Sequence, residues 1–477
     1  MIFFAIVFFS NNLISQTVFQ THIQDSNDKK VFKIFEDTNT YLVSGSISNS
    51  VRKAAYIAKL DSMGSLVKTR IVSDPNYDIE IVDAIKGDTN YVFIGFMQNE
   101  FINSDSYLWV LVTDKELNTL SKNSFFIDTA NIMRYASSVY THKGTILIAA
   151  IYEKINIFDF KSYLFEISPI GDSLNSNINN YPDTSSLFCN IMETSNNTYK
   201  VIAASFFMFG ANQVVQIDSN LNYISHTIIP TFHVNATSMG VADYGKKYYA
   251  LFNYHDNDRQ VIISKFNAAN DSVLDTKILG VQDTIDYAAY RGLSQSGKYL
   301  YMGYTSNSTP TYTWYGIGQE SKFVVTKLDT ALNIIWEKRI GLPGMYLKLL
   351  EVKATKDGGC ILMGTTHDNS AIQKNDILIV KLDSNGTTTW TQNIKVPQVK
   401  FTIFPNPTKQ SLNIVLDSEN QSMKEYQIFD LQGKLILQKQ IGAKQYKIDV
   451  QSLARGVYII KGITNSGAQF QSRFVKE

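Results

Sequence analysis

Cysteine and histidine are scarce in this chain of 477 residues, which contains two Cys and six His. Cys189 and Cys360 stand far apart, and no two His residues form an H-x-x-H or H-E-x-x-H pattern. Metal sites built from Cys and His usually take ligands that lie a few residues apart in the sequence. The spacing of Cys and His in this chain therefore indicates no metal site. We therefore predict no bound metal and no cofactor.

No charge sign dominates the chain, whose formal net charge is +1. Residues 400–477 hold 11 Lys or Arg and 6 Asp or Glu, which leaves the rest of the chain slightly acidic. Proteins that bind nucleic acid present a basic surface to the phosphates, so we predict no nucleic-acid partner.

Long apolar runs are also lacking, and the most apolar segment lies at the N-terminus, "MIFFAIVFFSNNLISQ". Its run of roughly ten apolar residues is too short to span a bilayer but has the length of a signal-peptide core. We predict a signal peptide over residues 1–15, cleaved after Ser15, although no Lys or Arg precedes the run. No other segment approaches about 18 uninterrupted apolar residues, so no transmembrane segment is predicted.

A repeated pattern of four short strands fills residues 31–396. One apolar strand recurs as "YLVSGS" at 41, "YVFIGF" at 91, "ILIAAI" at 146, "YKVIAAS" at 199, "YYALFN" at 248, "YLYMGYT" at 299 and "CILMGTT" at 360. One strand precedes each copy and two follow it, with polar turns between them. Four strands per unit of about 50 residues is typical of a β-propeller, so we predict a seven-bladed β-propeller over residues 16–396.

The segments 323–340 and 377–394 resemble the β-propeller repeats of many secreted bacterial proteins. In four of the seven repeats of this chain, an Asp opens the turn between the third and fourth strands: Asp61, Asp218, Asp329 and Asp383. An Asp side chain at this position can accept hydrogen bonds from backbone N–H groups of the turn. Gly64 and Gly386 supply positive φ in two of these turns. The alternative, calcium binding, lacks a D-x-D-x-D-G string.

Two further predictions depend on the ring. Residues 17–23, "TVFQTHI", look like an extra strand that closes the ring by pairing with the last blade, either replacing or flanking "TTWTQNI" at 388–394.

Cys189 and Cys360 fall in blades that are not neighbours, and a disulfide needs Cα atoms within about 7 Å. We predict that they do not bond to each other.

The C-terminal segment has a different pattern. A Pro-containing linker at 397–403 precedes short alternating strands over 404–477 that indicate a small Ig-like β-sandwich. Its motifs are Pro405-Asn406-Pro407, "IFDLQGK" at 428–434 with Gly433, "ARGVYIIKG" at 454–462 with Gly456 and Tyr458, and the basic end "SRFVKE". Together they resemble the type A C-terminal sorting domain of the type IX secretion system of Bacteroidetes.

That resemblance implies a secreted or surface-attached protein, exported through the periplasm. It implies the secretion machinery and its sortase as partners, with the passenger either released or joined to surface lipopolysaccharide. The Pro residues cannot donate to a sheet ladder, which places them at an edge or a hinge.

Enzyme motifs are missing from the repeats: there is no G-x-S-x-G, no P-loop and no G-x-G-x-x-G after a strand. "LDSNGTTTW" at 382–390 is similar to a sialidase box but has one residue too many between its Asp and Gly. The innermost strands carry Asp83, Glu193, Asp243, Arg291 and Glu351. These residues either line a wet channel or supply the carboxylate pair of a glycan-active enzyme, such as a glycoside hydrolase or lyase.

Aromatic residues are the candidates for ligand binding. The connections between second and third strands emerge on one face of a propeller, and here they carry Phe101, Phe158, Phe207, Phe209, Tyr312, Trp314 and Tyr315. Such rings either stack on glycans or peptides or fill gaps between blades. We expect Trp314, in the longest of these connections, to lie over the mouth of the central channel. The sequence favours a non-catalytic glycan- or protein-binding module or surface scaffold, with a glycan-active enzyme as the alternative.

Overall fold

Short antiparallel strands form the regular structure of the chain, in agreement with the predicted all-β class. The computed structural model describes residues 18–24, 27–48, 52–99, 105–129, 131–154, 159–179, 186–194, 198–205, 212–229, 241–244, 246–256, 258–280, 285–307, 320–368, 374–388, 401–416, 422–430, 435–443, 445–464 and 469–477. Two units, Met1–Thr391 and Gln392–Glu477, have their own internal contacts and are described separately. The predicted signal peptide lies outside the described residues.

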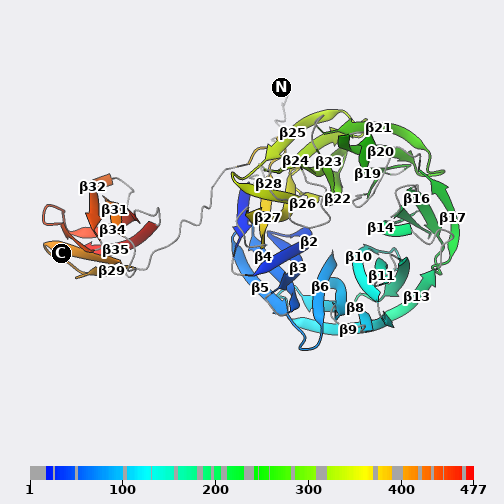
Figure 1. The fold of residues 1–477 in the computed structure, drawn as a ribbon, viewed down its shortest axis with the longest axis horizontal. Helices are drawn as coiled ribbons and strands as arrows, with labels where there is room; N and C mark the ends of the chain where they lie inside the picture. Colours follow the sequence, from blue (N-terminus) through cyan, green and yellow to red (C-terminus); the bar gives the residue numbers. More distant parts are fainter. Residues whose placement is uncertain are drawn as a thin grey trace, which may run out of the picture. The chain divides into compact units, whose positions relative to one another are not determined.

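Groups of four consecutive strands make up the first unit, each paired in chain order and arranged around a ring (Figure 1). Five of the sheets in the described part have four strands each. The first sheet contains β2 (Asp28–Asp37), β3 (Thr40–Ser48), β4 (Lys53–Asp61) and β5 (Leu66–Val72), and the second contains β6 (Asp78–Lys86), β7 (Asn90–Gln98), β8 (Asp105–Asp114) and β9 (Thr119–Thr129). The third contains β10 (Asn131–Tyr140), β11 (Ile146–Lys154), β12 (Asp159–Ile167) and β13 (Ser173–Asn179); the fourth contains β14 (Ser186–Glu193), β15 (Tyr199–Ser205), β16 (Gln213–Ile217) and β17 (Tyr223–Ile228); and the fifth contains β18 (Val241–Tyr244), β19 (Lys247–Asp256), β20 (Asp258–Asn267) and β21 (Val273–Leu279).

An eight-stranded sheet completes the ring. It contains β22 (Tyr287–Ser296), β23 (Tyr299–Ser306), β24 (Lys322–Asp329), β25 (Ile334–Ile340), β26 (Met345–Ala354), β27 (Cys360–Asp368), β28 (Asn375–Leu382) and β1 (Phe19–Ile23). A single parallel bridge, between Arg291 of β22 and Glu351 of β26, joins its two halves. Each half therefore has the same four-stranded pattern as the other sheets.

The N-terminal strand closes the ring, as predicted from residues 17–23. Strand β1 pairs antiparallel with β28, with Phe19 opposite Lys381 and Ile23 opposite Ile377. Phe19 is buried and packs edge-on against Tyr41 of the first sheet, with ring centroids 5.3 Å apart. The start of the chain thus joins the last sheet to the first.

The core of the ring lies between neighbouring sheets. Ile57 and Phe93 belong to a cluster shared by the first two sheets, and Val31 and Met363 to one shared by the last sheet and the first. Because both faces of each sheet are covered, the second and third strands are nearly continuous apolar runs, without the alternation of a half-exposed strand.

The turns between third and fourth strands have the predicted chemistry. Asp61 Oδ1 accepts the N–H groups of Met63 and Ser65 at 2.9 and 2.8 Å. The same two bonds recur at Asp114, Asp218, Asp329 and Asp383. These carboxylates accept hydrogen bonds from the backbone of their own turns. Separately, the described residues contain no group of three or more His, Cys, Asp or Glu able to hold a metal ion.

One position in these turns has positive φ, and two kinds of residue occupy it. Gly64 and Gly386 have φ of 81° and 73°, whereas Leu117, Leu221 and Leu332 have φ of 64°, 67° and 61°. All three Leu side chains are buried in the core. At Gly64 an added Cβ would lie 2.3 Å from the Phe19 ring. Whether Gly or Leu occupies this turn position therefore depends on whether a side chain from a neighbouring strand already fills the space that the Leu side chain would take.

Cys360 confirms the prediction about disulfides, because it is a free, buried cysteine on β27. Cys189 lies on β14, in a different sheet. Burial raises the pKa of the Cys360 thiol to about 12. The thiol therefore stays protonated and packs as an apolar side chain.

The second unit contains two small sheets around one core. The sheets order as β29 (Phe401–Phe404), β30 (Ser411–Leu416), β33 (Gln445–Asp449), and as β32 (Leu435–Ala443), β31 (Met423–Phe429), β34 (Gly456–Thr464), β35 (Gln469–Lys476). Ile414 and Ile448 of one sheet share a cluster with Ile428 and Ile460 of the other. Strand β29 starts inside the segment 397–403 that the sequence assigns to a linker, because Phe401 and Ile403 pack against this core.

Candidate functional site

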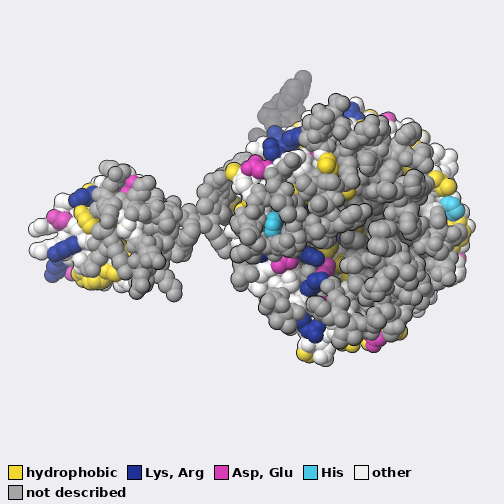
Figure 2. Space-filling view, in the orientation of Figure 1, with side chains coloured by type: hydrophobic (Ala, Val, Ile, Leu, Met, Phe, Trp, Pro, Cys, Tyr) yellow, Lys and Arg dark blue, Asp and Glu magenta, His cyan; other side chains and the backbone are white. Residues whose placement is uncertain are grey.

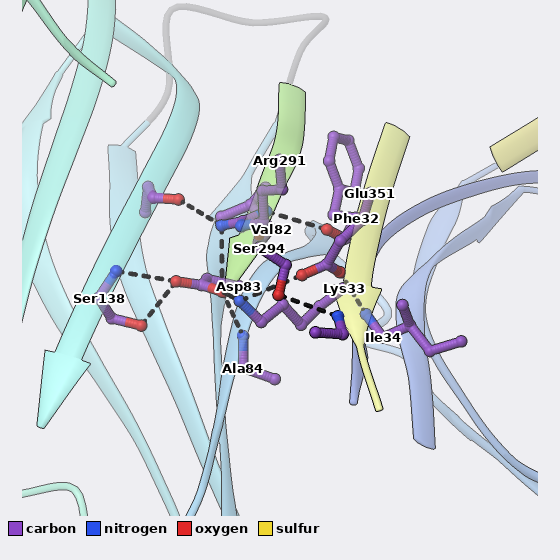
Figure 3. A network of polar contacts seen from close by, with 12 residues as sticks. Phe32, Lys33, Ile34, Val82, Asp83, Ala84, Ser138, Arg291, Ser294 and Glu351 are labelled. Atoms are coloured by element: carbon purple, nitrogen blue, oxygen red, sulfur yellow. Dashed lines mark hydrogen bonds and ion pairs between the residues drawn. The ribbon is translucent and has the colours of Figure 1, made fainter. Parts of the chain in front are cut away.

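Charged side chains from four innermost strands meet in the ring: Lys33 of β2, Asp83 of β6, Arg291 of β22 and Glu351 of β26 (Figure 3). We call these four residues the ring-centre cluster. Asp83, Arg291 and Glu351 are buried, with 1%, 8% and 2% of their surface exposed. The sequence named these three as inner-strand residues but did not predict that they meet. It missed Lys33, although Lys33 and Glu351 occupy the same position relative to a β-bulge in their strands.

Asp83 is surrounded by donors. Its Oδ1 lies 3.0 Å from an Arg291 guanidinium nitrogen and 3.2 Å from Lys33 Nζ, and it accepts the Ala84 N–H at 2.9 Å. Its Oδ2 accepts the N–H and hydroxyl of Ser138 at 2.8 and 2.6 Å. Burial alone would raise the pKa of Asp83, but Arg291, Lys33 and these hydrogen bonds together lower it below its usual value. Asp83 is therefore a fixed carboxylate.

Arg291 links several sheets through backbone carbonyls. One guanidinium nitrogen donates to Phe32 O at 2.9 Å and Val82 O at 3.1 Å, and the other donates to Ala136 O at 3.0 Å. These carbonyls belong to β2, β6 and β10, while Arg291 itself comes from β22. One side chain thus ties together four sheets, including sheets far apart in the chain (Figure 3).

An irregularity in β22 places Arg291 at this point. The pairing of β22 with β23 is interrupted between Ala288 and Leu293, and Arg291 instead bridges to Glu351. Gly292 lies inside the interruption, where an added Cβ would be 2.5 Å from the carbonyl oxygen of Gly303. The absence of a side chain at Gly292 therefore allows the interrupted part of β22 to pass close to the backbone of β23.

Glu351 and Lys33 complete the cluster. Glu351 Oε2 accepts the N–H of Ile34 at 2.5 Å, and Oε1 lies 3.5 Å from Lys33 Nζ. Lys33 thus stands between the two carboxylates. A glycosidase needs one carboxyl group that holds a proton until it donates it. Asp83, held ionised by its neighbours, is unsuited to that role.

The two other inner-strand candidates lie outside the cluster. Glu193 accepts the backbone N–H of His142 at 2.8 Å, and its second oxygen contacts His142 Nδ1. Asp243 belongs to β18, where it pairs with Tyr248, and its side chain lies outside what the structure describes.

The aromatic candidates fall outside the described residues. These are Phe101, Phe158, Phe207, Phe209, Tyr312, Trp314 and Tyr315. The strands that flank their connections are described, and Asp28 at the start of β2 pairs with Ser48 at the end of β3. Each connection between second and third strands therefore leaves the ring on the face where the innermost strands begin.

In the second unit, the Pro-Asn-Pro motif is bonded to the last strand. Asn406 Nδ2 donates to Arg473 O at 3.1 Å, and Asn406 Oδ1 accepts the N–H of Val475 at 2.8 Å. Thr408 then exchanges two backbone bonds with Val475 and Glu477, at 2.8 and 2.9 Å. We call these contacts the C-terminal clasp. Pro405 and Pro407 are exposed beside the edge strand β29, as their missing N–H groups require.

The other sorting residues fall at the ends of strands or outside the description. Gly456 begins β34, and Tyr458 is buried with its hydroxyl donating to Ala454 O at 3.0 Å. Tyr458 also stacks on Phe474 of β35, with ring centroids 5.6 Å apart. Gly433 lies outside the described residues. The sequence identified these motifs but could not show that the first and last of them bond to each other.

Fold and motifs together define a class: a propeller-like ring of four-stranded sheets followed by a small domain for export. Residues 402–477 match the secretion system C-terminal sorting domain family, which confirms the resemblance seen in the motifs. This domain directs a protein through the type IX secretion system and across the outer membrane, so the protein is secreted or attached to the cell surface. Within the described part of the chain, no helix combines the length and apolar character needed to cross a membrane.

Several solved structures are similar to the chain at low sequence identity. The β-propeller domain of the Trilobed protease from Pyrococcus furiosus is 9% identical, with 76% of this chain and 99% of that chain covered and a TM-score of 0.41. The WD40 domain of SCAP from fission yeast is 12% identical, with 76% and 96% covered and a TM-score of 0.37. A protein of unknown function from Dyadobacter fermentans is 12% identical, with 65% and 96% covered and a TM-score of 0.43. No curated protein matches the sequence.

Proposed function

We propose that the ring is a seven-bladed β-propeller that binds a glycan or protein ligand at the cell surface without catalysing a reaction. The blade count is supported by the five four-stranded sheets and by the two four-stranded halves of the eight-stranded sheet. We further propose that residues 16–396 form this propeller and residues 404–477 an Ig-like sorting domain.

The observation that carries the non-catalytic proposal is the state of Asp83. Its two oxygens together receive two cations and three hydrogen bonds, which leaves no oxygen of this carboxylate without a protein partner. Arg291 is likewise committed to three backbone carbonyls. Groups held in this way stabilise a scaffold, whereas a catalytic acid must exchange its proton with a substrate.

A glycan and peptide array probed with residues 16–396, combined with hydrolysis assays on the glycans bound, tests this proposal. We expect binding without cleavage, and we expect Asp83→Asn to leave the set of bound ligands unchanged in protein that remains folded. Cleavage of a bound glycan that is lost in Asp83→Asn or Glu351→Gln would favour a glycan-active enzyme instead.

The long connection at 305–321 is proposed as part of the binding face. Trp314, Tyr312 and Tyr315 give it aromatic surface suited to stacking on sugars, and Phe101, Phe158 and Phe209 belong to neighbouring connections. Trp314→Ala is expected to reduce ligand binding with little change in melting temperature. A lower melting temperature with unchanged binding would mean that Trp314 serves packing.

A further inference from the structure

The outermost strand of the second sheet, β9, is longer than its counterparts in the described part of the ring. It has 11 residues, whereas β5, β13, β17, β21 and β25 have six or seven. Leu66 at the start of β5 and Thr119 at the start of β9 both lie five positions after the Asp that opens the preceding turn. Strand β9 therefore continues over residues 126–129, beyond the point at which β5 ends.

Three aromatic rings meet at the start of this extension. Phe126 pairs with Tyr107 of β8, and the two rings meet edge to face with their centroids 5.8 Å apart. The ring of Tyr77, in the connection between β5 and β6, meets the Tyr107 ring in the same way at 5.7 Å. We call Tyr77, Tyr107 and Phe126 the rim aromatics. They come from three separate segments and form one continuous aromatic surface.

The position of Tyr77 is fixed by a turn of its own. Asp74 Oδ1 accepts the backbone N–H groups of Asn76 at 2.9 Å and of Tyr77 at 3.2 Å. An Asp bonded in this way stabilises a tight turn, which holds the Tyr77 ring against Tyr107. The aromatic surface is therefore formed before any ligand binds, and this lowers the entropic cost of binding.

Of the three rings, Phe126 is the most exposed to solvent, with an exposed fraction of 57%. Figure 2 shows hydrophobic side chains at the outer edge of the ring, on the side where Figure 1 places β9. The residues on either side of Phe126, Phe125 and Ile127, pack against a core that the second and third sheets share. Packing therefore accounts for Phe125 and Ile127 but not for Phe126.

A carboxylate lies beside the rings. Asp105 Oδ2 accepts the hydroxyl group of Tyr107 at 3.1 Å, and the Asp105 side chain is half-buried. Within the part of the chain that the structure describes, Asp105 Oδ1 has no hydrogen-bond or ion-pair partner. Both oxygens of an ionised carboxylate accept hydrogen bonds, so Asp105 is able to accept O–H groups from a ligand.

The arrangement of the rings favours a saccharide over a cation. A cation binds where the faces of aromatic rings converge on it. The planes of successive rim aromatics are 83° and 70° apart, so the edge of one ring covers part of the face of the next. One exposed aromatic face beside an acceptor suits a saccharide, which has a face of C–H groups and hydroxyl groups at its edges.

We propose that the rim aromatics and Asp105 bind a neutral saccharide, whose C–H face stacks on Phe126 and whose hydroxyl groups donate to Asp105. The inference rests on the proposed binding function and specifies the class of ligand and the place where it binds. Asp105 begins β8, directly after the connection from β7, so the site lies at the outer rim of the face where these connections leave the ring. The negative charge of Asp105 disfavours acidic saccharides.

Hydroxyl-radical footprinting of the full chain, read by mass spectrometry, tests the site directly. The neutral probes are maltohexaose, cellohexaose and mannohexaose, and the acidic probe is hexagalacturonate. Oxidation of Phe126 is divided by oxidation of Met63, an exposed residue in the turn between β4 and β5, so that radical scavenging by the sugars cancels. We expect a neutral hexaose to lower this ratio and hexagalacturonate to leave it unchanged. Equal ratios with and without every neutral probe would overturn the proposal.

Variants of the full chain, tested on the glycan and peptide array, show which residues hold the saccharide. We expect Phe126→Ala to weaken the binding of neutral glycans by roughly five- to tenfold, the effect of losing one stacked ring. Asp105→Ala should also weaken it, because an acceptor for hydroxyl groups is lost. The matched control is Leu120→Ala, on the same strand and 58% exposed, which should bind as the parent does. Melting temperatures of Phe126→Ala and Leu120→Ala should equal that of the parent, since both side chains are largely exposed.

The outcomes separate this proposal from the proposed function. Neutral glycans that bind Phe126→Ala and the parent equally would overturn the site and leave the binding function standing. A peptide ligand that is lost in Phe126→Ala would assign the rim aromatics to a protein partner and overturn the saccharide proposal. Cleavage of a hexaose that protects Phe126 would overturn the non-catalytic function and leave the site standing.

Discussion

At the scale of single residues, the ring depends on a small number of buried charges. Arg291 compensates for the loss of water around its guanidinium group with three carbonyls and a carboxylate. Residue types alone indicated Asp83, Arg291 and Glu351 as inner-strand residues, because each falls in the strand before a recurring apolar strand. Their meeting could not be predicted, because it depends on the interruption of β22 and on the reach of Arg291 across sheets.

Replacing Arg291 by Leu is expected to lower the free energy of unfolding of the ring by about 3–5 kcal/mol, because a buried Asp83 loses its guanidinium partner. Arg291→Lys keeps the charge but not the fork of donors, so its loss should be smaller. The matched control is Arg339→Leu, whose ion pair with Glu337 is partly exposed and is worth at most about 1 kcal/mol. Denaturant titration measures all three, and equal midpoints for Arg291→Leu and the control would mean that the cluster does not hold the ring.

The low pKa of Asp83 predicts how stability changes with pH. A carboxyl group with a lowered folded pKa stabilises the fold fully above its unfolded pKa of about 3.9, and this contribution is lost as pH falls through the folded value. Asp83→Asn should therefore be less stable than the parent at pH 7, with the difference shrinking as the pH is lowered below about 4. Unfolding free energies across this range check the prediction, and a difference that stays constant with pH would contradict it.

At the scale of elements, the repeated strands and turns were predictable and the specific contacts between them were not. Turn-opening Asp residues are local signals, so Asp61 and Asp383 could be identified from the sequence. The use of Leu221 at a positive φ could not, because that choice depends on packing between sheets. The bond from Asn406 to β35 likewise joins residues 69 positions apart, which no local pattern reveals.

Replacing the residue at the positive-φ position should destabilise the ring, whether that residue is Leu or Gly. Leu221→Gly relieves backbone strain worth roughly 1 kcal/mol but removes a buried side chain worth about 2–5 kcal/mol, so a net loss is expected. Gly64→Ala should also lose stability, because the added Cβ meets the Phe19 ring. Thermal unfolding measures both, with Gly144→Ala as control, where an added Cβ meets no atom within 4 Å. An increase in melting temperature for Leu221→Gly would contradict this account.

The C-terminal clasp predicts a graded effect of Asn406 on the last strand. Asn406→Ala removes both side-chain bonds to β35, whereas Asn406→Asp keeps an acceptor for Val475 and loses the donor to Arg473. Each exposed bond is worth about 0.5–1.5 kcal/mol. Hydrogen exchange at Val475 and Glu477 in the full chain should accelerate most in Ala and less in Asp. Exchange as slow as in the parent would show that Asn406 does not hold β35.

At the scale of the whole molecule, one chain contains a ring that closes on its own N-terminal strand and a domain that directs export. Composition and motif order were sufficient to predict both parts, because a four-strand repeat and a sorting motif each consist of residues that lie close together in the sequence. The same sequence left the ligand open, since a binding face is assembled from connections that come from different blades.

The central claim is that the C-terminal unit exports a ring that folds without it. The most direct measurement compares the location of the full chain with that of a chain lacking residues 400–477, in a host that carries the type IX secretion system. We expect the full chain at the cell surface or in the medium. The truncated chain should remain in the periplasm, folded and with a cooperative thermal transition, because the ring and the tail have separate cores. Truncated protein reaching the surface or medium at normal levels would contradict the account.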